Sequence, residues 1–417
     1  MKLTPPVVEL CRRQFPALAR RVGELPAVFF DGPGGTQVPF RVIEAVSHCL
    51  AHTNANHGGR FATSIEGDKL LAEAHRGLAD FLGADDPDCV VFGQNMTSLT
   101  FALSRALARR WRPGDEVLVT RLDHDANVSP WVLAARDAGA VVRFVPLRHE
   151  DCTLDLDALR GLLSSRSRLV AVGAASNATG TLNPVRDIAD WAHDVGAQVF
   201  VDAVHYAPHA LVDVQGLGCD FLACSAYKFF GPHVGVLWGR RRLLEEIEAY
   251  KVRPAPDTPP GKWMTGTQSH EAIVGALAAV EYLADLGRSL AASDALSRRA
   301  ALREAYREIA TYERMLVRRL LEGLDRIGDI KVWGITDSSR LDERVATVSL
   351  THARFSAAEM AEKLGRAGFF VWHGNYYALQ LTEALGLEPD GMLRVGLVHY
   401  NTVAEVERLL EALHGLR

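Results

Sequence analysis

The stretch "DFLACSAYKFFGPHVGVLWG" (220–239) contains a lysine, Lys228, between two apolar runs. The first run (221–224) predicts a buried strand, and a turn at Gly231-Pro232 leads into the second run (234–238). A lysine in such surroundings is out of place unless its amine has a partner or a chemical use. The rest of the sequence therefore has to explain what holds Lys228 there.

Segments with the periods of strands and of helices alternate through the first two-thirds of the chain. Strand patterns such as "CVVFG" (89–93) and "EVLVT" (116–120) are separated by helical patterns such as "SLTFALSRALARRW" (98–111). This alternation predicts an α/β fold with a mostly parallel sheet that is covered on both faces.

The last third of the chain has a different pattern. A proline-rich loop (253–263) is followed by a long helical stretch (269–323), and then by the order strand, strand, helix, strand, helix. The pattern predicts a large α/β domain over 20–285 and a smaller α+β domain over 286–417, to which the N-terminal residues 1–19 belong.

Composition and charge exclude several classes of protein. The 417 residues carry a net charge of −5 and no basic run, so nucleic acid is not an expected partner. No apolar run approaches the ~18–20 residues of a membrane span, and the N-terminus has no apolar leader, so we expect a cytoplasmic protein. The six cysteines lack CxxC spacing, which argues against a zinc site and a disulfide scaffold and suits a reducing cytosol.

The residues that directly follow the predicted strands carry the chemistry. In open α/β sheets a ligand lies outside the carboxyl ends of the strands, so these residues meet in one crevice. The segment "QNMTS" (94–98) follows one strand at the start of a helix, where free N–H groups make an anion site. The side chains that follow the other strands are His124, Asn177, Asp202, His205, Ser225 and Lys228.

This set of residues fits pyridoxal phosphate. A lysine forms a Schiff base with the cofactor, a carboxylate holds the pyridinium N–H, and a helix N-terminus takes the phosphate. Asp202 precedes Lys228 by 26 residues, which is enough for one crossover and a return strand. We therefore interpret Lys228 as an amine held by a covalent imine, and Asp202 as the carboxylate of the pyridinium.

One histidine pair in this region has a spacing that metal sites also use. His205 and His209 stand at i and i+4, as two metal ligands on a helix would. Pro208 lies between them and disrupts such a helix, so we expect no metal.

A resemblance to a known family covers nearly the whole chain. The segment "VDAVHYAPHALVDVQGLGCDFLACSAYKFFGPHVGVLWG" (201–239) resembles the class V aminotransferase family of pyridoxal-phosphate enzymes, and within it the cysteine desulfurase-like group. The resemblance extends from "FFDGPGGTQVP" (29–39) to "LRVGLVHYNTVAEVERLL" (393–410). It implies a PLP-dependent transferase of fold-type I, whose large domain has a mostly parallel seven-stranded sheet. It also implies an amino-acid substrate and a homodimer with sites shared between the subunits.

The resemblance also implies a role for each candidate residue. Lys228 is the Schiff-base lysine, Asp202 the partner of the pyridinium, and His124 the catalytic residue stacked on the ring. His205 contacts the side of the ring that carries the hydroxyl group. The residues implied for the phosphate are Met96 (through its backbone), Thr97, Ser225 and Tyr227, with Thr267 reaching the phosphate of the neighbouring subunit. The residues implied for the substrate are Asn177 and Arg394 at its carboxylate, Arg60 at the entrance, and Tyr377 as active-site lining.

One departure from the family bears on the reaction. Cysteine desulfurases carry a nucleophilic cysteine on a loop of the C-terminal domain, and the matching loop here is "VWHGNYYALQL" (371–381). Tyr377 stands in the place of that cysteine, and Trp372 replaces an arginine that usually precedes the loop. The nearest cysteine in sequence is Cys224, on the strand that leads to the lysine. A phenol cannot accept sulfur as a persulfide.

We therefore expect an enzyme that acts on an α-amino acid through an external aldimine, with desulfurase-like lyase chemistry at or beyond Cβ and no loop-cysteine persulfide. Three other reactions stay open: epimerisation or racemisation of the isopenicillin N epimerase type, transamination, and true cysteine desulfuration with another nucleophile. A catalytically idle scaffold paralogue is the alternative from another class of protein. The residues do not name the substrate amino acid.

Overall fold

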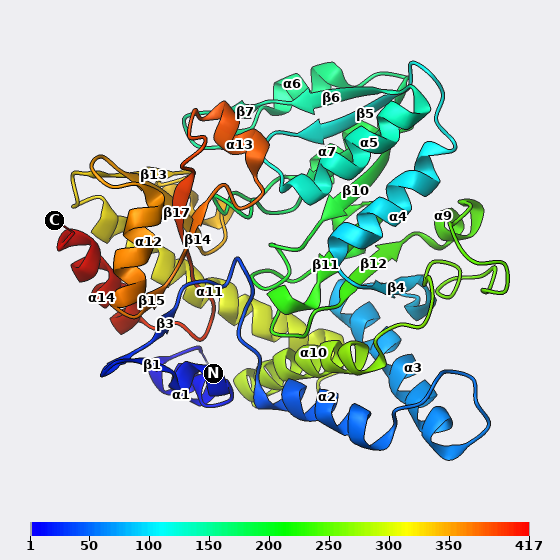
Figure 1. Cartoon of the computed structure of the whole chain (residues 1–417), viewed down its shortest axis with the longest axis horizontal. Helices are drawn as coiled ribbons and strands as arrows, with labels where there is room; N and C mark the ends of the chain where they lie inside the picture. Colours follow the sequence, from blue (N-terminus) through cyan, green and yellow to red (C-terminus); the bar gives the residue numbers. More distant parts are fainter. Residues whose placement is uncertain (1, 417) are drawn as a thin grey trace.

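The computed structural model describes residues 2–416, and its largest element is a seven-stranded sheet (Figure 1). In spatial order its strands are β4 (Val90–Gly93), β12 (Gly235–Gly239), β11 (Phe221–Ser225), β10 (Gln198–Asp202), β9 (Ser167–Gly173), β5 (Glu116–Thr120) and β6 (Val141–Val145). The five strands from β11 to β6 run parallel to one another, and β12 is antiparallel to both of its neighbours. The predicted mostly parallel seven-stranded sheet is confirmed.

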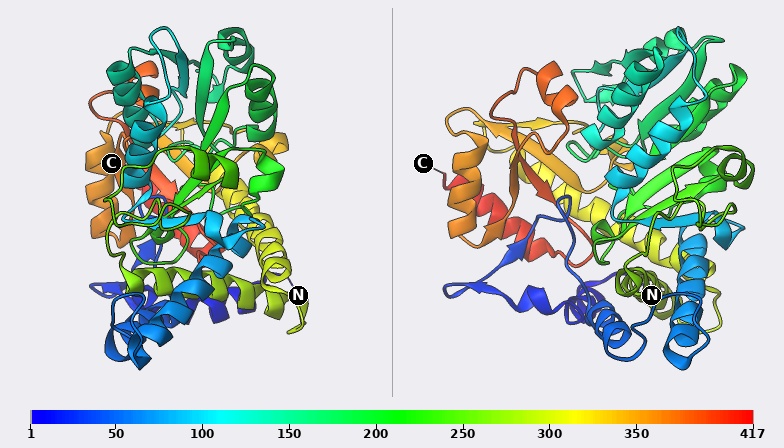
Figure 2. Two further views of the ribbon diagram at one scale, coloured as in Figure 1. Left: turned by 90° about the vertical axis from the view of Figure 1, so that its right-hand side faces the viewer. Right: turned by 45° about the vertical axis from the view of Figure 1, so that its right-hand side comes forward.

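Helices cover both faces of this sheet, which is why its central strands are mostly apolar. Every residue of β5, β11 and β12 is buried. Helices α4 (Met96–Ala108) and α5 (Ser129–Ala138) pack together on one face, and α7 (Val185–Asp194) packs on β9 and β10 from the other (Figure 2). The other helices of this part are α2 (Phe40–His52), α3 (Ala62–Leu82), α6 (Leu156–Leu162), α8 (Val214–Leu217) and α9 (Arg241–Glu246).

The long helical stretch expected over 269–323 is two helices, α10 (His270–Ala291) and α11 (Arg298–Leu324). The chain leaves the first helix at Ala292, which has a positive φ of 52°. The second helix begins after Ser297, whose side chain caps its first turn. The helical pattern has no proline between residues 269 and 323 and did not reveal this break.

Helices α10 and α11 approach each other closely at Gly287. A Cβ at this position would lie 1.8 Å from the carbonyl oxygen of Ala301, so only a glycine fits there. The domain boundary predicted between residues 285 and 286 falls inside α10, and the division of the chain into two domains stays a prediction.

A second, antiparallel sheet forms the C-terminal part of the molecule. In spatial order its strands are β13 (Ile330–Trp333), β14 (Thr347–His352), β17 (Met392–Gly396) and β16 (Trp372–Gly374). Helix α12 (Ala357–Arg366) packs on this sheet, and α14 (Val403–His414) packs against α11. The expected α+β tail is confirmed, with β16 and α13 (Leu379–Ala384) as elements that the pattern did not predict.

The N-terminal segment runs from this second part to the large sheet. After α1 (Pro5–Arg12) and the hairpin of β1 (Arg21–Val22) and β2 (Leu25–Pro26), strand β3 (Val28–Phe29) pairs in parallel with β15 (Phe369–Phe370). Asp31 then bridges to Gly396, and the chain continues through a loop toward α2 (Figure 1). The remaining strands form one short hairpin, β7 (Leu147–Arg148) and β8 (Thr153–Leu154). Within residues 2–416, no helix combines the length and the hydropathy needed to cross a lipid bilayer.

Candidate active site

A cavity of about 600 Å³ lies where the carboxyl ends of β5, β9, β10 and β11 meet the four-stranded sheet and the N-terminal loop. This is the position that the order of the strands predicts for a ligand. All of the candidate residues from the sequence line this cavity except Arg60 and Thr267. Both of those side chains are exposed outside it, and their implied roles stay predictions.

Lys228 points its amine at the N-terminal loop. Its Nζ donates to the carbonyl oxygens of Pro33 and Gly34, the latter at 3.1 Å. Burial, reinforced by the charge of Arg394 and opposed by Asp202, lowers the pKa of Lys228 from 10.5 to about 7. Two backbone carbonyls therefore hold the lysine, and near neutral pH a large fraction of its amine is the unprotonated nucleophile.

Asp202 is the last residue of β10 and is 7% exposed. Its Oδ1 accepts the N–H of Val204 at 2.8 Å. Burial raises the pKa of this carboxyl to about 6, while the Val204 bond and the charge of Lys228 act in the opposite direction. A buried carboxyl of this kind is stabilised as an anion by any cationic group placed next to it.

His124 lies after β5 and presents a neutral ring to the cavity. Burial, with Lys228 and Arg394 nearby, lowers the pKa of His124 to about 4. Its Nδ1 accepts the N–H of Ala126 at 3.0 Å, which fixes the ring's orientation. The ring of Tyr377 stacks on it at 5.4 Å between centroids and an interplanar angle of 23°.

The start of α4 forms the candidate phosphate site. The N–H of Met96 donates to Ser225 Oγ at 2.9 Å, so two of the implied phosphate ligands lie in contact. Asn95 caps the helix, and its side chain accepts the N–H of Ser98 at 2.8 Å. Thr97 and Tyr227 line the cavity beside them. A helix N-terminus with small hydroxyl side chains suits an anion.

Arg394 and Asn177 lie together on the side of the four-stranded sheet. Arg394 on β17 is 4% exposed, and its Nη1 donates to the backbone oxygen of Asn177 at 2.8 Å. The ring of Tyr376 covers the guanidinium, with 4.1 Å from its carbon to the ring centroid. Asn177 Oδ1 and Arg394 Nε are buried without a hydrogen-bond partner among the described residues. This corner therefore has unused polar atoms and a cation that could hold a carboxylate.

His205 lies at the inner wall of the cavity. Its Nε2 bonds to Thr347 Oγ1 at 2.9 Å, and burial holds the pKa of His205 well below its usual range. His209 behind it bonds through Nδ1 to Glu313 Oε2 at 2.7 Å. The histidine pair from the sequence therefore has a hydroxyl and a carboxylate as partners.

Among the ionisable residues that line the cavity, sequence reasoning missed Asp123. Asp123 is 4% exposed, and its Oδ1 accepts the N–H of Gly173 at 2.8 Å, next to Asp202 across the strand pair. Burial and then the charge of Asp202 raise the pKa of Asp123 to about 8. The signal was its place directly before His124 after a strand. Tyr376, which directly precedes Tyr377, covers Arg394.

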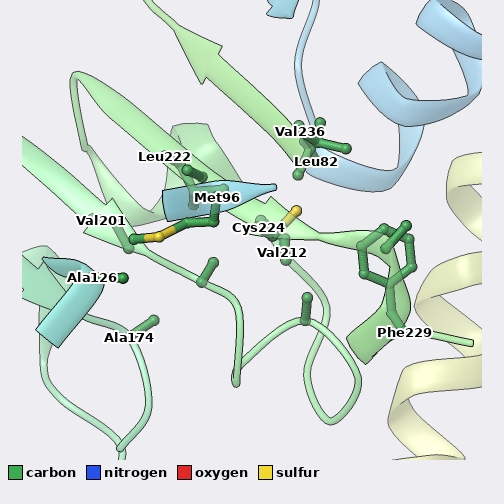
Figure 3. Close-up of a cluster of buried hydrophobic side chains, with 14 of the residues drawn as sticks. Leu82, Met96, Ala126, Ala174, Val201, Val212, Leu222, Cys224, Phe229 and Val236 are labelled. Atoms are coloured by element: carbon green, nitrogen blue, oxygen red, sulfur yellow. The ribbon is translucent and has the colours of Figure 1, made fainter. Parts of the chain in front are cut away.

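None of the six cysteines lines this cavity. All six are buried, and Cys224 is 0% exposed inside an apolar cluster with Val201, Leu222 and Phe229 (Figure 3). Burial raises the pKa of the Cys224 thiol far above its usual range, so it does not supply a thiolate.

The cavity's residues fit pyridoxal phosphate. An amine with a pKa near neutrality can condense with the cofactor's aldehyde, and a carboxyl stands at the neighbouring strand end. The buried polar atoms without partners, Asn177 Oδ1, His205 Nδ1 and Arg394 Nε, match a cavity that takes a polar occupant. The fold and this cavity define a pyridoxal-phosphate-dependent enzyme of fold-type I.

Comparison with known proteins names the family within this class. The profile described as aminotransferase class-V matches residues 28–409, and the chain belongs to that family. The chain is 34% identical to an aminotransferase-like protein of Gibberella zeae, over 97% of each chain. It is 30% identical to a cysteine desulfurase of Pectobacterium carotovorum, over 98% of each. The solved apo structure of a cysteine desulfurase from Thermococcus onnurineus superimposes with a TM-score of 0.85 at 25% identity, covering 97% of each chain. The predicted family, fold type, cofactor and enzyme class are confirmed.

Proposed function

We propose that the protein cleaves an α-amino acid at or beyond Cβ, with desulfurase-like lyase chemistry but without a cysteine persulfide on the active-site loop. The observation that carries this proposal is the identity of the loop residue at the cavity. Tyr377 stacks on His124 where the family's cysteine is expected, and none of the six cysteines reaches the cavity. A leaving group can depart from Cβ without a nucleophile on the loop, whereas a persulfide needs a thiol.

Pyridoxal phosphate, when bound, supplies an electron-withdrawing ring to the α-carbon of the substrate. We assign Lys228 Nζ to hold the cofactor's aldehyde and then to move the proton at Cα, because its pKa near 7 suits both tasks. Asp202 would hold the protonated ring nitrogen, and neutral His124 would contact the ring. The groups assigned to the phosphate are the Met96 N–H, Thr97, Ser225 and Tyr227.

The substrate carboxylate is assigned to Arg394 and Asn177. No ion pair of Arg394 is found among the described residues, its Nε is unused, and Asp31 is the carboxylate whose charge acts on it. A guanidinium that is 4% exposed and makes no direct ion pair is costly, and a ligand carboxylate in contact with it would reduce that cost. We therefore place the substrate's α-carboxylate against it.

The protein is proposed to work as a cytoplasmic homodimer with sites shared between subunits. Thr267 is exposed outside the cavity of its own chain, as a residue that serves a second subunit would be. Helices α2 and α3 expose an apolar group that a second copy would cover, formed by Phe40, Ile43, Leu50, Phe61 and Ile65. The six free cysteines suit a reducing compartment.

A transaminase is the second candidate function, because the aminotransferase-like relative shares 34% identity with the chain. The experiment that separates the candidates uses the cofactor-loaded protein and a panel of L- and D-amino acids. Absorbance reports binding, mass spectrometry identifies a lyase or transaminated product, and chiral chromatography identifies a racemised one. Borohydride should fix the cofactor to Lys228 in the wild type and in Lys251→Ala, but not in Lys228→Ala. A cofactor band that no amino acid perturbs would identify an idle scaffold.

A further inference from the structure

Two adjacent tyrosines form a strained turn at the mouth of the cavity. Tyr376 and Tyr377 both have a positive φ, of 53° and 60°, although neither is a glycine. Such residues cost roughly 1–3 kcal/mol each and persist only where surrounding contacts hold them. Asn177 Nδ2 donates to the backbone oxygen of Tyr376 at 3.0 Å, and the N–H of Asp125 donates to that of Tyr377 at 2.7 Å. Two loops that follow strands of the large sheet therefore hold this turn by hydrogen bonds to its backbone.

The two rings of the strained turn contact two different groups. Tyr376 covers the guanidinium of Arg394 at 4.1 Å, and its hydroxyl donates to the backbone oxygen of Met392. Tyr377 stacks on His124, with 72% of its own surface exposed. One turn thus orders the proposed carboxylate site and leaves a free aromatic face at the entrance.

Trp372 supplies a third aromatic ring to the same entrance. Its indole lies over Gly34, where a Cβ would stand 2.2 Å from Nε1. Gly34 is also the residue whose backbone oxygen accepts from Lys228 at 3.1 Å. Trp372 is 51% exposed, so a large indole surface faces solvent close to the reactive amine.

The charged side chains that line the cavity are Asp123, Asp202, Lys228 and Arg394. The lining segment 372–377, which carries the exposed rings of Trp372 and Tyr377, has no carboxylate, ammonium or guanidinium side chain of its own, and the carboxylate of Glu388 accepts from Asn375 Nδ2 at 3.1 Å. A substrate whose amine reaches Lys228 and whose carboxylate reaches Arg394 places its side chain in the space that remains, against these rings. The exposed faces of Trp372 and Tyr377 offer an aromatic side chain a surface on which to stack.

We propose that the substrate is an α-amino acid with an aromatic side chain, which stacks against Trp372 and Tyr377 while Tyr376 orients Arg394. The proposal rests on the proposed function, because it takes the placement of the amine and carboxylate from it. Trp372 and Tyr377 are then residues that determine specificity, and Tyr376 is a positioning residue.

The test measures the binding of two carboxylates that lack an amine and so cannot react. Calorimetry of the cofactor-loaded protein compares 3-phenylpropionate with propionate. We expect 3-phenylpropionate to bind the wild type at least tenfold more tightly, equivalent to about 1.4 kcal/mol or one aromatic contact. Trp372→Ala and Tyr377→Ala should each reduce this ratio at least threefold, with propionate binding unchanged within about twofold. Trp372→Phe should keep the preference.

The matched control is Tyr250→Ala, which removes an aromatic residue that is 52% exposed outside the cavity. This variant should bind both carboxylates like the wild type. Equal binding of the two carboxylates by the wild type, or a ratio that neither alanine variant changes, overturns the proposal. A protein that forms no borohydride-reducible adduct at Lys228 refutes the proposed function instead, so the two failures are distinguishable.

Discussion

Replacing Lys228 by methionine should change how the stability of the cofactor-free protein depends on pH. The pKa of Lys228 is about 7 in the folded chain and 10.5 in its ordinary state, so between these values the unfolded chain binds more protons. Stability from this group therefore rises with pH in that window, by up to about 1.4 kcal/mol for each pH unit. From about pH 7 to about pH 9 the gain is about 2 kcal/mol, because half of the amines are already neutral at the lower limit.

The measurement is urea unfolding of the wild type and of Lys228→Met at several pH values in this window. Asp123, whose raised pKa gives the opposite slope up to about pH 8, is present in both proteins. The pKa values of Asp202 and His124, on which the charge of Lys228 acts, are about 6 and about 4 and lie below the window, so the difference between the two curves reports mainly the lysine. Lys251→Met is the matched control, because Lys251 keeps Asp257 as an ion-pair partner at 3.0 Å at the surface. Parallel stability curves for the wild type and Lys228→Met would refute a buried amine with a lowered pKa.

Three further predictions follow from other parts of the molecule. Thr267→Ala should weaken cofactor retention by roughly 1.5–3 kcal/mol, the value of a hydrogen bond to a charged group. Cofactor release on dilution measures this loss, and a fully loaded, active monomer in sedimentation would contradict the shared site. Exposure to L-cysteine should leave no transferable persulfide on the intact protein, because Tyr377 replaces the loop cysteine. Any sulfur that is released should appear as free sulfide. A gain of one sulfur in the intact mass, transferred to a reductant at a catalytic rate, would identify a working desulfurase. Gly287→Ala should lower the free energy of unfolding by about 1–3 kcal/mol or more, because its Cβ would meet the Ala301 carbonyl; unchanged unfolding in urea would mean that the two helices can separate at no cost.

The sequence was sufficient to predict the large sheet and the residues at the ends of its strands. Apolar runs that end in Asp202 or lead to Lys228 could be interpreted because a parallel sheet brings the carboxyl ends of its strands to one edge. The same reasoning did not reveal the carbonyl acceptors of Pro33 and Gly34, because backbone groups leave no sequence signature.

The entrance of the cavity was harder to predict than its floor. Tyr376 and Tyr377 have identical side chains, and the turn that their positive φ angles form places one ring on Arg394 and the other on His124. Such strained conformations are imposed by tertiary contacts and oppose local propensity, so a sequence pattern cannot indicate them. Asp123 was missed for a related reason, since only the folded chain shows that its carboxyl lies beside Asp202.

The hydrogen bonds that hold Lys228 join distant parts of the chain. Its acceptors at Pro33 and Gly34 lie 195 and 194 residues upstream, in a segment that also pairs with the C-terminal part through β3 and β15. Contacts of such long sequence separation close large loops, at an entropic cost that the contacts must offset. The acceptors of the amine lie outside the seven-stranded sheet, so the orientation of the reactive lysine depends on the N-terminal loop and on the strand pair that holds this loop to the C-terminal part.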